Sequence, residues 1–253
     1  NNIHVENCLF DSNRRLNLSI TDGYDIYIDN NTFLNAGIDT ANSEGVAPRY
    51  AIDIEAYRVG DVLYEDASDI YIRNNIEKGS YNGAFTVAIG RNVTIENNET
   101  ENSIGYSVGS GIIIRNNTIT AVDQENIDGG TAINCGRNDS NNIFNNKVYN
   151  NTINNWSTGI YALGRKISQN SKDLEVIGNT ITNCKNAIRT RGLLNAKISD
   201  NKIFSDRDSS YGISTNMWLD EVEITGNVVD VKTKAFTSID LNVENGQENY
   251  IYT

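Results

Sequence analysis

The chain has 253 residues, a formal net charge of −12 and a pI of about 4.5. Such an acidic surface would repel the phosphate backbone of DNA or RNA, so nucleic acid is not an expected partner. No apolar run approaches the roughly 18 residues that span a membrane, so no membrane insertion is expected.

The absence of linkers and the small numbers of histidines and cysteines limit the domain number and the kinds of metal or disulfide site to expect. No Pro/Gly/Ser-rich linker or charge block divides residues 1–253, so we expect one domain. His4 is the only histidine, which excludes a multi-histidine metal site, and we assign no metal ligand. Cys8, Cys135 and Cys184 are widely separated, and we expect them to be buried free thiols.

A repeat runs along the chain from its first residues to Val229. In each copy two aliphatic residues alternate with variable ones, and a turn residue, an Asn, a variable residue and another aliphatic residue follow. The clear copies are residues 26–33, 93–100, 112–119, 175–181, 196–203 and 222–229, and the weaker ones are residues 3–10, 70–77 and 147–153. The Asn position is held by Cys8, Asn31, Asn75, Asn98, Asn117, Asn151, Asn179, Asn201 and Asn227.

The spacing of these positions predicts the fold. The intervals are 23, 44, 23, 19, 34, 28, 22 and 26 residues. Alternating aliphatics with a period in the twenties indicate units that bury their apolar faces only by stacking, and the leucine framework of leucine-rich repeats is absent. We therefore predict an all-β, single-stranded, right-handed parallel β-helix of about nine coils. The Asn column should form a ladder of side-chain amides at tight turns.

A second strand follows the Asn turn in most coils. Its copies are residues 17–20, 51–54, 84–87, 132–135, 159–162, 187–190 and 212–215. They predict two outward columns. The first is Ser19, Asp53, Thr86, Asn134, Tyr161, Arg189 and Ser214, and the second is Thr21, Glu55, Ala88, Gly136, Leu163, Arg191 and Asn216. The coil after Asn98 is short, and its second strand is not aligned.

Asp53 and Glu55 are the only acids in these columns. Two positions apart on one strand, they share a face, with Cα atoms roughly 6.6 to 6.8 Å apart. Carboxyl pairs that cleave glycosides lie about 5 to 9.5 Å apart, so this pair could act as acid and nucleophile or base. The alternative is ordinary solvated surface, with Asp53 paired to Arg14 or Arg49.

The same strand lies in the longest coil, the 44 residues from Asn31 to Asn75. Long loops on a rigid scaffold are where function concentrates. These loops and the coil below supply arginines, acids and aromatics suited to sugar rings and hydroxyls. The predicted substrate-binding residues are Arg14, Arg15, Glu44, Arg49, Tyr50, Tyr57 and Arg58. Arg189 and Arg191 form a rival centre for an anionic sugar, and Trp156 and Trp218 are expected in packing or trimer contacts.

Two segments carry a family resemblance. Residues 13–20 (NRRLNLSI) and 45–55 (GVAPRYAIDIE) resemble the pattern NRR-x-G-I-S-I followed by GTAP-x-x-GIDIEP of the pectate-lyase-like superfamily of right-handed β-helix proteins. The pattern is found in bacteriophage tailspike depolymerases and bacterial polysaccharide-degrading proteins. The chain departs from it at Asn17 and Ala51, where glycine is usual, and at Ala56, where proline is usual.

The resemblance implies a trimeric, extracellular or virion-borne enzyme acting on surface polysaccharide, with Asp53 and Glu55 at the matching positions. The superfamily contains hydrolases, lyases and epimerases, so the fold does not fix the reaction. The leading hypothesis is a depolymerase that hydrolyses a bacterial surface glycan without a cofactor. The alternatives are a β-eliminating lyase on a uronate glycan, in which Ca²⁺ could take part, and a non-catalytic glycan-binding rod. Both chain ends lack a capping element, which suggests a fragment of a longer protein or a trimer in which other segments supply the caps.

Overall fold

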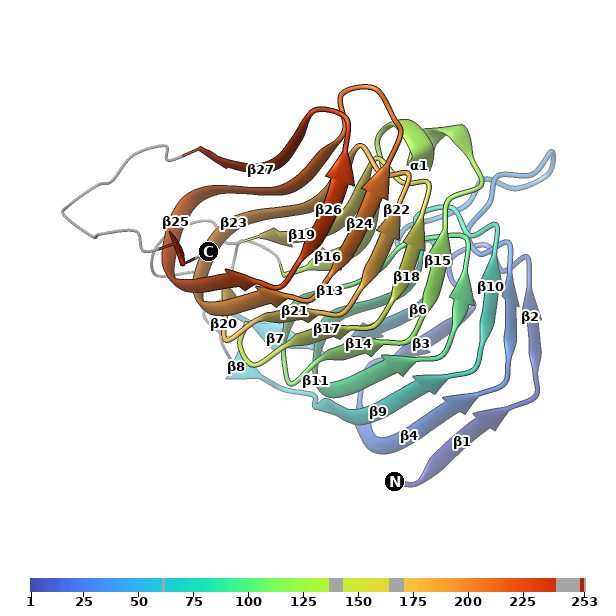
Figure 1. Cartoon of the computed structure of the whole chain (residues 1–253). Helices are drawn as coiled ribbons and strands as arrows, with labels where there is room; N and C mark the ends of the chain where they lie inside the picture. Colours follow the sequence, from blue (N-terminus) through green and yellow to red (C-terminus); the bar gives the residue numbers. More distant parts are fainter. Residues whose placement is uncertain (61, 137–142, 164–170, 240–250, 253) are drawn as a thin grey trace.

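The computed structural model describes residues 1–60, 62–136, 143–163, 171–239 and 251–252. Side chains of residues 216–218, 237–239 and 251–252 are outside this description, so the expectation for Trp218 lies outside it as well. The chain is a right-handed parallel β-helix, as the repeat predicts. Its coils stack from the N-terminal to the C-terminal end, and each coil passes through three walls of strands (Figure 1).

Wall 1 contains the strands that precede the Asn turn. It consists of β1 (Ile3–Glu6), β4 (Gly23–Asp29), β9 (Ala67–Arg73), the second half of β11 (Gly83–Glu96), β14 (Ile113–Arg115), β17 (Lys147–Tyr149), β20 (Ser171–Lys172), β21 (Glu175–Ile177), the second halves of β23 (Asn186–Ser199) and β25 (Tyr211–Thr225), and β28 (Ile251–Tyr252). Neighbouring strands pair in parallel with aliphatic residues in register, as in Ile26 beside Ile70 and Ile28 beside Ile72.

Wall 2 is a nine-stranded sheet that follows the Asn turn. It consists of β2 (Leu9–Asp11), β5 (Thr32–Leu34), β10 (Ile76–Lys78), β12 (Glu99–Thr100), β15 (Thr118–Thr120), β18 (Thr152–Asn154), β22 (Thr180–Thr182), β24 (Lys202–Ser205) and β26 (Val228–Val231). The short helix α1 (Gln124–Asp128) leaves the rod between walls 2 and 3, and the Asp123 side chain accepts a hydrogen bond from Asn126 N at its start (Figure 1).

Wall 3 carries the two predicted acids. It consists of β3 (Leu18–Ile20), β6 (Tyr50–Glu55), the first half of β11, β13 (Ile104–Ser110), β16 (Thr131–Cys135), β19 (Thr158–Leu163), the first halves of β23 and β25, and β27 (Lys234–Ile239). Because β11, β23 and β25 run on from wall 3 into wall 1, the two walls count as one 17-stranded sheet.

In the Asn turn, two adjacent residues have different structural roles. The first residue takes left-handed backbone geometry, with φ of 58° at Asn30 and 55° at Asn74. The second forms the ladder, in which Asn31 N and Asn31 Nδ2 both donate to Asn75 Oδ1, at 2.8 and 3.1 Å. The pattern repeats through Asn227, so the predicted amide ladder is confirmed. A side-chain oxygen thereby satisfies a buried backbone donor in the coil before it.

The core is a set of aliphatic columns closed by a few large rings. Phe33, Phe85 and Trp156 are fully buried, and the Trp156 indole N–H donates to Ile119 O at 3.3 Å. Cys135 and Cys184 are buried free thiols as expected. The same expectation is wrong for Cys8, which is exposed in the turn between β1 and β2.

Candidate functional site

Strand β6 places Asp53 and Glu55 on the outer face of wall 3. Ile52 and Ile54 point into the core with no exposed surface, so the alternation of a strand turns Asp53 and Glu55 the other way. Asp53 lies between Ser19 of the coil below and Thr86 of the coil above. The first predicted column is therefore in register around Asp53.

The two carboxylates have different environments. Asp53 is only 3% exposed, whereas Glu55 is exposed. The Asp53 Oδ1 atom is buried and accepts no hydrogen bond from any described residue. Burial, followed by the negative charge of Glu55, raises the pKa of Asp53 to about 6, and the positive charge of Arg15 opposes that shift. When one acid is buried and its neighbour is exposed, their pKa values differ, so one can remain protonated as a donor while the other is charged.

Arg14 and Arg15 hold the loop that precedes β6. Arg14 Nε donates to Glu44 O at 2.9 Å, and Arg15 Nε donates to Ala47 O at 3.0 Å. The backbone oxygens of the same arginines accept from Val46 N and Arg49 N, each at 2.9 Å. The long coil is thus fastened to the coil below it, beside Asp53. Glu44 contributes its carbonyl to this contact, and its side chain is exposed.

Arg49 lies inside the same loop. Its guanidinium pairs with Asp39 at 3.1 Å, donates to Gly45 O and lies 4.2 Å from the centre of the Tyr81 ring. The loop closes on itself so tightly that a Cβ added at Gly45 would lie 1.9 Å from Gly37 O. Arg49 therefore builds the loop wall with these contacts.

A shallow groove continues from β6 along wall 3. It has a volume of about 210 Å³ and is lined by Tyr50, Thr86, Ser103, Gly105, Tyr106, Ser107, Asn134 and Gly136. The Tyr50 ring lies over Gly83, where an added Cβ would come within 2.5 Å of Tyr50 Cε1. Gly105 pairs with Thr86 below and Asn134 above, so it fills the column position that sequence reasoning missed. The alternation of Ile104, Tyr106 and Val108 was the signal for that strand.

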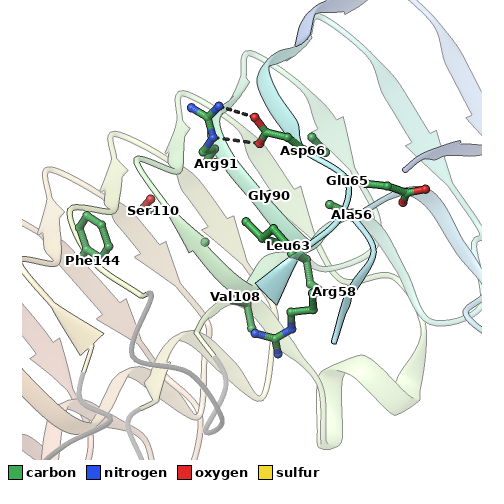
Figure 2. Close-up of a pocket in the computed structure, with 13 residues that line it drawn as sticks. Ala56, Arg58, Leu63, Glu65, Asp66, Gly90, Arg91, Val108, Ser110 and Phe144 are labelled. Atoms are coloured by element: carbon green, nitrogen blue, oxygen red, sulfur yellow. Dashed lines mark hydrogen bonds and ion pairs between the residues drawn. The ribbon is translucent and has the colours of Figure 1, made fainter. Parts of the chain in front are cut away.

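Tyr57 and Arg58 lie beyond the other end of β6, in a hairpin of β7 (Arg58–Val59) and β8 (Val62–Leu63). The Tyr57 and Tyr64 rings are 5.7 Å apart, and both are exposed. The hairpin bounds a second pocket of about 280 Å³, with Arg58 and Leu63 on one side, Phe144 on the other and the Arg91–Asp66 ion pair at its rim (Figure 2). The structure thus divides the predicted site in two. Tyr50 lines the groove on wall 3, whereas Arg58 lines the pocket beside the hairpin.

Glu55 stands between the two hollows. It ends β6, and Ala56, the next residue, lines the hairpin pocket. A bulge shifts the register here, so Glu55 pairs with Ile89 and not with Ala88, which corrects the second predicted column. Leu163, Arg191 and Asn216 of that column are in register as expected.

No cluster of three or more His, Cys, Asp or Glu residues suited to a metal ion occurs in the described part of the chain. Among the same residues, no helix has the length and apolar character needed to cross a membrane.

The fold defines the class as a right-handed parallel β-helix, and this one carries a pair of acids on the outer face of wall 3. The chain is 30% identical over 224 residues to the uncharacterized protein YclG of Bacillus subtilis, a match that covers 80% of the chain and 37% of YclG. The chain therefore spans little more than a third of the curated relative it matches. No protein-family profile matches it.

Solved structures share the fold. The surface protein and adhesin PfbA of Streptococcus pneumoniae superposes with a TM-score of 0.72 at 14% identity, covering 95% of this chain and 67% of PfbA. Tailspike protein gp49 of the Acinetobacter baumannii bacteriophage Fri1, a capsular polysaccharide depolymerase, superposes with a TM-score of 0.51 at 9% identity, covering 95% of this chain and 49% of gp49. At these identities the likeness establishes the β-helix alone.

Proposed function

We propose that the chain binds a polysaccharide on the outer face of wall 3 and hydrolyses it with Asp53 and Glu55. The observation that carries this proposal is the buried Asp53 carboxyl, whose Oδ1 has no described partner, beside the exposed carboxylate of Glu55. An unpartnered buried acid on an outward strand face costs stability, and such costs concentrate at functional sites.

The chemistry assigns a role to each acid. In glycoside hydrolysis one carboxylic acid protonates the leaving oxygen, and a second carboxylate attacks the sugar or activates water. Asp53 suits the acid role because burial raises its pKa to about 6, which keeps it protonated in mildly acidic solution. Glu55, exposed on the same strand face, suits the nucleophile or base.

In this proposal Arg14, Arg15, Glu44, Arg49 and Tyr50 lie on the groove side of the acids, and Tyr57 and Arg58 lie on the side of the separate hairpin pocket. The likeness to a tailspike depolymerase and a surface adhesin supports a polysaccharide partner and an extracellular or surface location. The homotrimer implied by the sequence resemblance belongs to the same proposal, and light scattering on the purified chain measures it.

A non-catalytic glycan-binding rod is the second candidate. It is favoured by the likeness to the adhesin PfbA, whose TM-score of 0.72 exceeds the 0.51 of the tailspike depolymerase. A rod of this kind would bind glycan at the same wall and release no new reducing ends. A β-eliminating lyase, with or without Ca²⁺, would instead release an unsaturated product that absorbs ultraviolet light.

The test is incubation with purified bacterial capsular and cell-wall glycans, with reducing ends and ultraviolet absorbance measured on the same samples. Hydrolysis predicts new reducing ends without absorbance. Asp53→Asn and Glu55→Gln should each lower the rate at least about 100-fold, the scale of a lost general acid or base. Glu99→Gln, an exposed acid on wall 2, is the matched control and should cleave at the wild-type rate. Full activity in both site variants would reject the assignment.

A further inference from the structure

We propose that the column above Asp53 is an extended subsite for an acidic polysaccharide, and that Arg189 holds one of its negative groups. This inference rests on the proposed function, because it assumes that the polymer lies along wall 3. It adds the charge class of the polymer and the direction in which the polymer runs.

The strand register defines the path. Five successive pairings lead from Asp53 to Arg189, through Thr86, Gly105, Asn134 and Tyr161. At about 4.8 Å for each coil, Arg189 lies roughly 24 Å from Asp53 along the rod. A polymer that reaches both positions must contain several sugar units and run parallel to the rod axis.

The wall along this path is hollow and polar. The groove covers the coils of Thr86, Gly105 and Asn134, and Gly105 contributes no side chain at the centre of the column. The hydroxyl of Thr86 and the amide of Asn134 can donate to and accept from sugar hydroxyls. No acid occupies the column between Asp53 and Arg189, so this line of the wall adds no negative charge beside an anionic chain.

The far end of the path offers a positioned cation. Arg189 is exposed and forms no ion pair with any described residue, and its guanidinium lies 5.2 Å from the centre of the Tyr161 ring. The ring holds the guanidinium on the outer face, where its fork of N–H donors can bind a carboxylate or a sulfate in a bidentate manner.

The overall charge limits how acidic the polymer can be. A chain with net charge −12 repels a densely charged polyanion. A polysaccharide with widely spaced acidic groups avoids most of that repulsion, because charges separated by more than about 8 Å are screened at physiological salt. Arg189, at the end of a five-coil path, fits a polymer of this kind.

The experiment measures binding separately from cleavage. The Asp53→Asn variant, which should not cleave, is titrated calorimetrically with each polysaccharide of the glycan panel and with the carboxyl-reduced form of each acidic one. We expect an acidic polymer to bind and its reduced form to bind at least about tenfold more weakly, a difference of about 1.4 kcal/mol. Adding Arg189→Gln should cause a similar loss, and Arg189→Lys should restore part of it.

Two controls separate this contact from a general effect. Arg115→Gln, which removes an exposed arginine paired with Glu96 on wall 1, should leave affinity unchanged. Oligosaccharides too short to span five coils should bind the Arg189→Gln variant as tightly as the parent. Thermal unfolding of each variant checks that the wall remains folded.

The outcomes distinguish the two proposals. Tight binding of a neutral polymer, or an Arg189→Gln variant that binds long chains normally, rejects the inference and leaves hydrolysis standing. Weaker binding by Arg189→Gln without cleavage by the wild-type protein supports the subsite and rejects the enzyme. If no polysaccharide of the panel binds, both proposals are rejected.

Discussion

Both carboxylate oxygens of Glu77 accept hydrogen bonds from Asn102 in the next coil, Oε2 from the backbone N–H and Oε1 from the side-chain amide, each at 3.1 Å. Oε1 also accepts from Ser80 N at 3.1 Å. Glu77 has no exposed surface, and burial raises the pKa of its carboxyl. A buried acid therefore joins two turns between walls 2 and 3, where the Asn ladder does not reach.

Glu77→Gln should destabilise the fold. Each carboxylate oxygen faces N–H donors, so a glutamine must turn its own NH₂ group toward one of them. We expect a loss of about 2 kcal/mol in the free energy of unfolding, the scale of an unsatisfied buried donor. Urea titration of the variant and of Glu99→Gln measures it, and equal losses in the two would contradict the role given to Glu77.

Asn98→Ala should break the ladder. The Asn98 side chain accepts from Asn75 N and Asn75 Nδ2, and it donates to Ile72 O and Asn117 Oδ1. Its removal takes these partners from buried polar groups in the two coils that flank Asn98, and we expect a loss of about 3 kcal/mol. Asn42→Ala, in the exposed loop before β6, is the control for losing an asparagine. A midpoint shift no larger than that of the control would argue against the ladder as a source of stability.

Asp53→Asn should change stability in a pH-dependent way. An unfolded Asp titrates near pH 3.9, and the folded-state pKa of Asp53 is about 6, so the folded chain holds this proton more tightly. Its stabilising contribution is complete below about pH 4 and is lost as the pH rises through 6. The melting temperature of the variant, relative to that of the wild type, should therefore rise between pH 4 and pH 8. Calorimetry at pH 4 and pH 8 measures the two melting temperatures, with Asp208→Asn, a change at an exposed acid, as the reference. A difference between variant and wild type that is the same at both pH values would refute this prediction.

Gly45→Ala should damage the loop and spare the rod. The added Cβ would meet Gly37 O at 1.9 Å, which forces the Asp39–Arg49 segment out of place. Because the segment lies outside the stacked walls, we expect the unfolding free energy to fall by no more than about 1 kcal/mol. Limited proteolysis should cut residues 37–49 faster. Gly129→Ala, where the nearest atom would be 3.5 Å away, should show neither effect.

The stacking could be predicted from the sequence because one residue type marks each turn. Asn31, Asn75 and Asn98 repeat at the same point of the aliphatic pattern, and the structure places them in one ladder. The first outward column followed from the same periodicity, since residues two apart on a strand share a face. The prediction of a single domain over residues 1–253 and the number of coils stay predictions.

The environment of the acids could not be predicted in the same way. Periodicity gives the direction of Asp53 but not the depth of the surrounding loops, and the loop contacts of Arg14 and Arg15 depend on carbonyl positions that no pattern encodes. The bulge that pairs Glu55 with Ile89 was missed because it depends on local backbone geometry. Tyr57 and Arg58 were grouped with the acids by sequence proximity, whereas Arg58 lines a separate pocket beside β7 and β8, and the Tyr57 ring lies near that of Tyr64.

The 44-residue interval from Asn31 to Asn75 leaves the ladder intact, since the two side chains bond at 3.1 Å, against 3.0 and 2.9 Å for pairs 23 and 19 residues apart. Scaffold and specificity can therefore change independently in this molecule. A segment exchanged between two fixed rungs would bring a new recognition surface without altering the coils on either side. In such a rod, evolution or a protein engineer can replace loops one at a time.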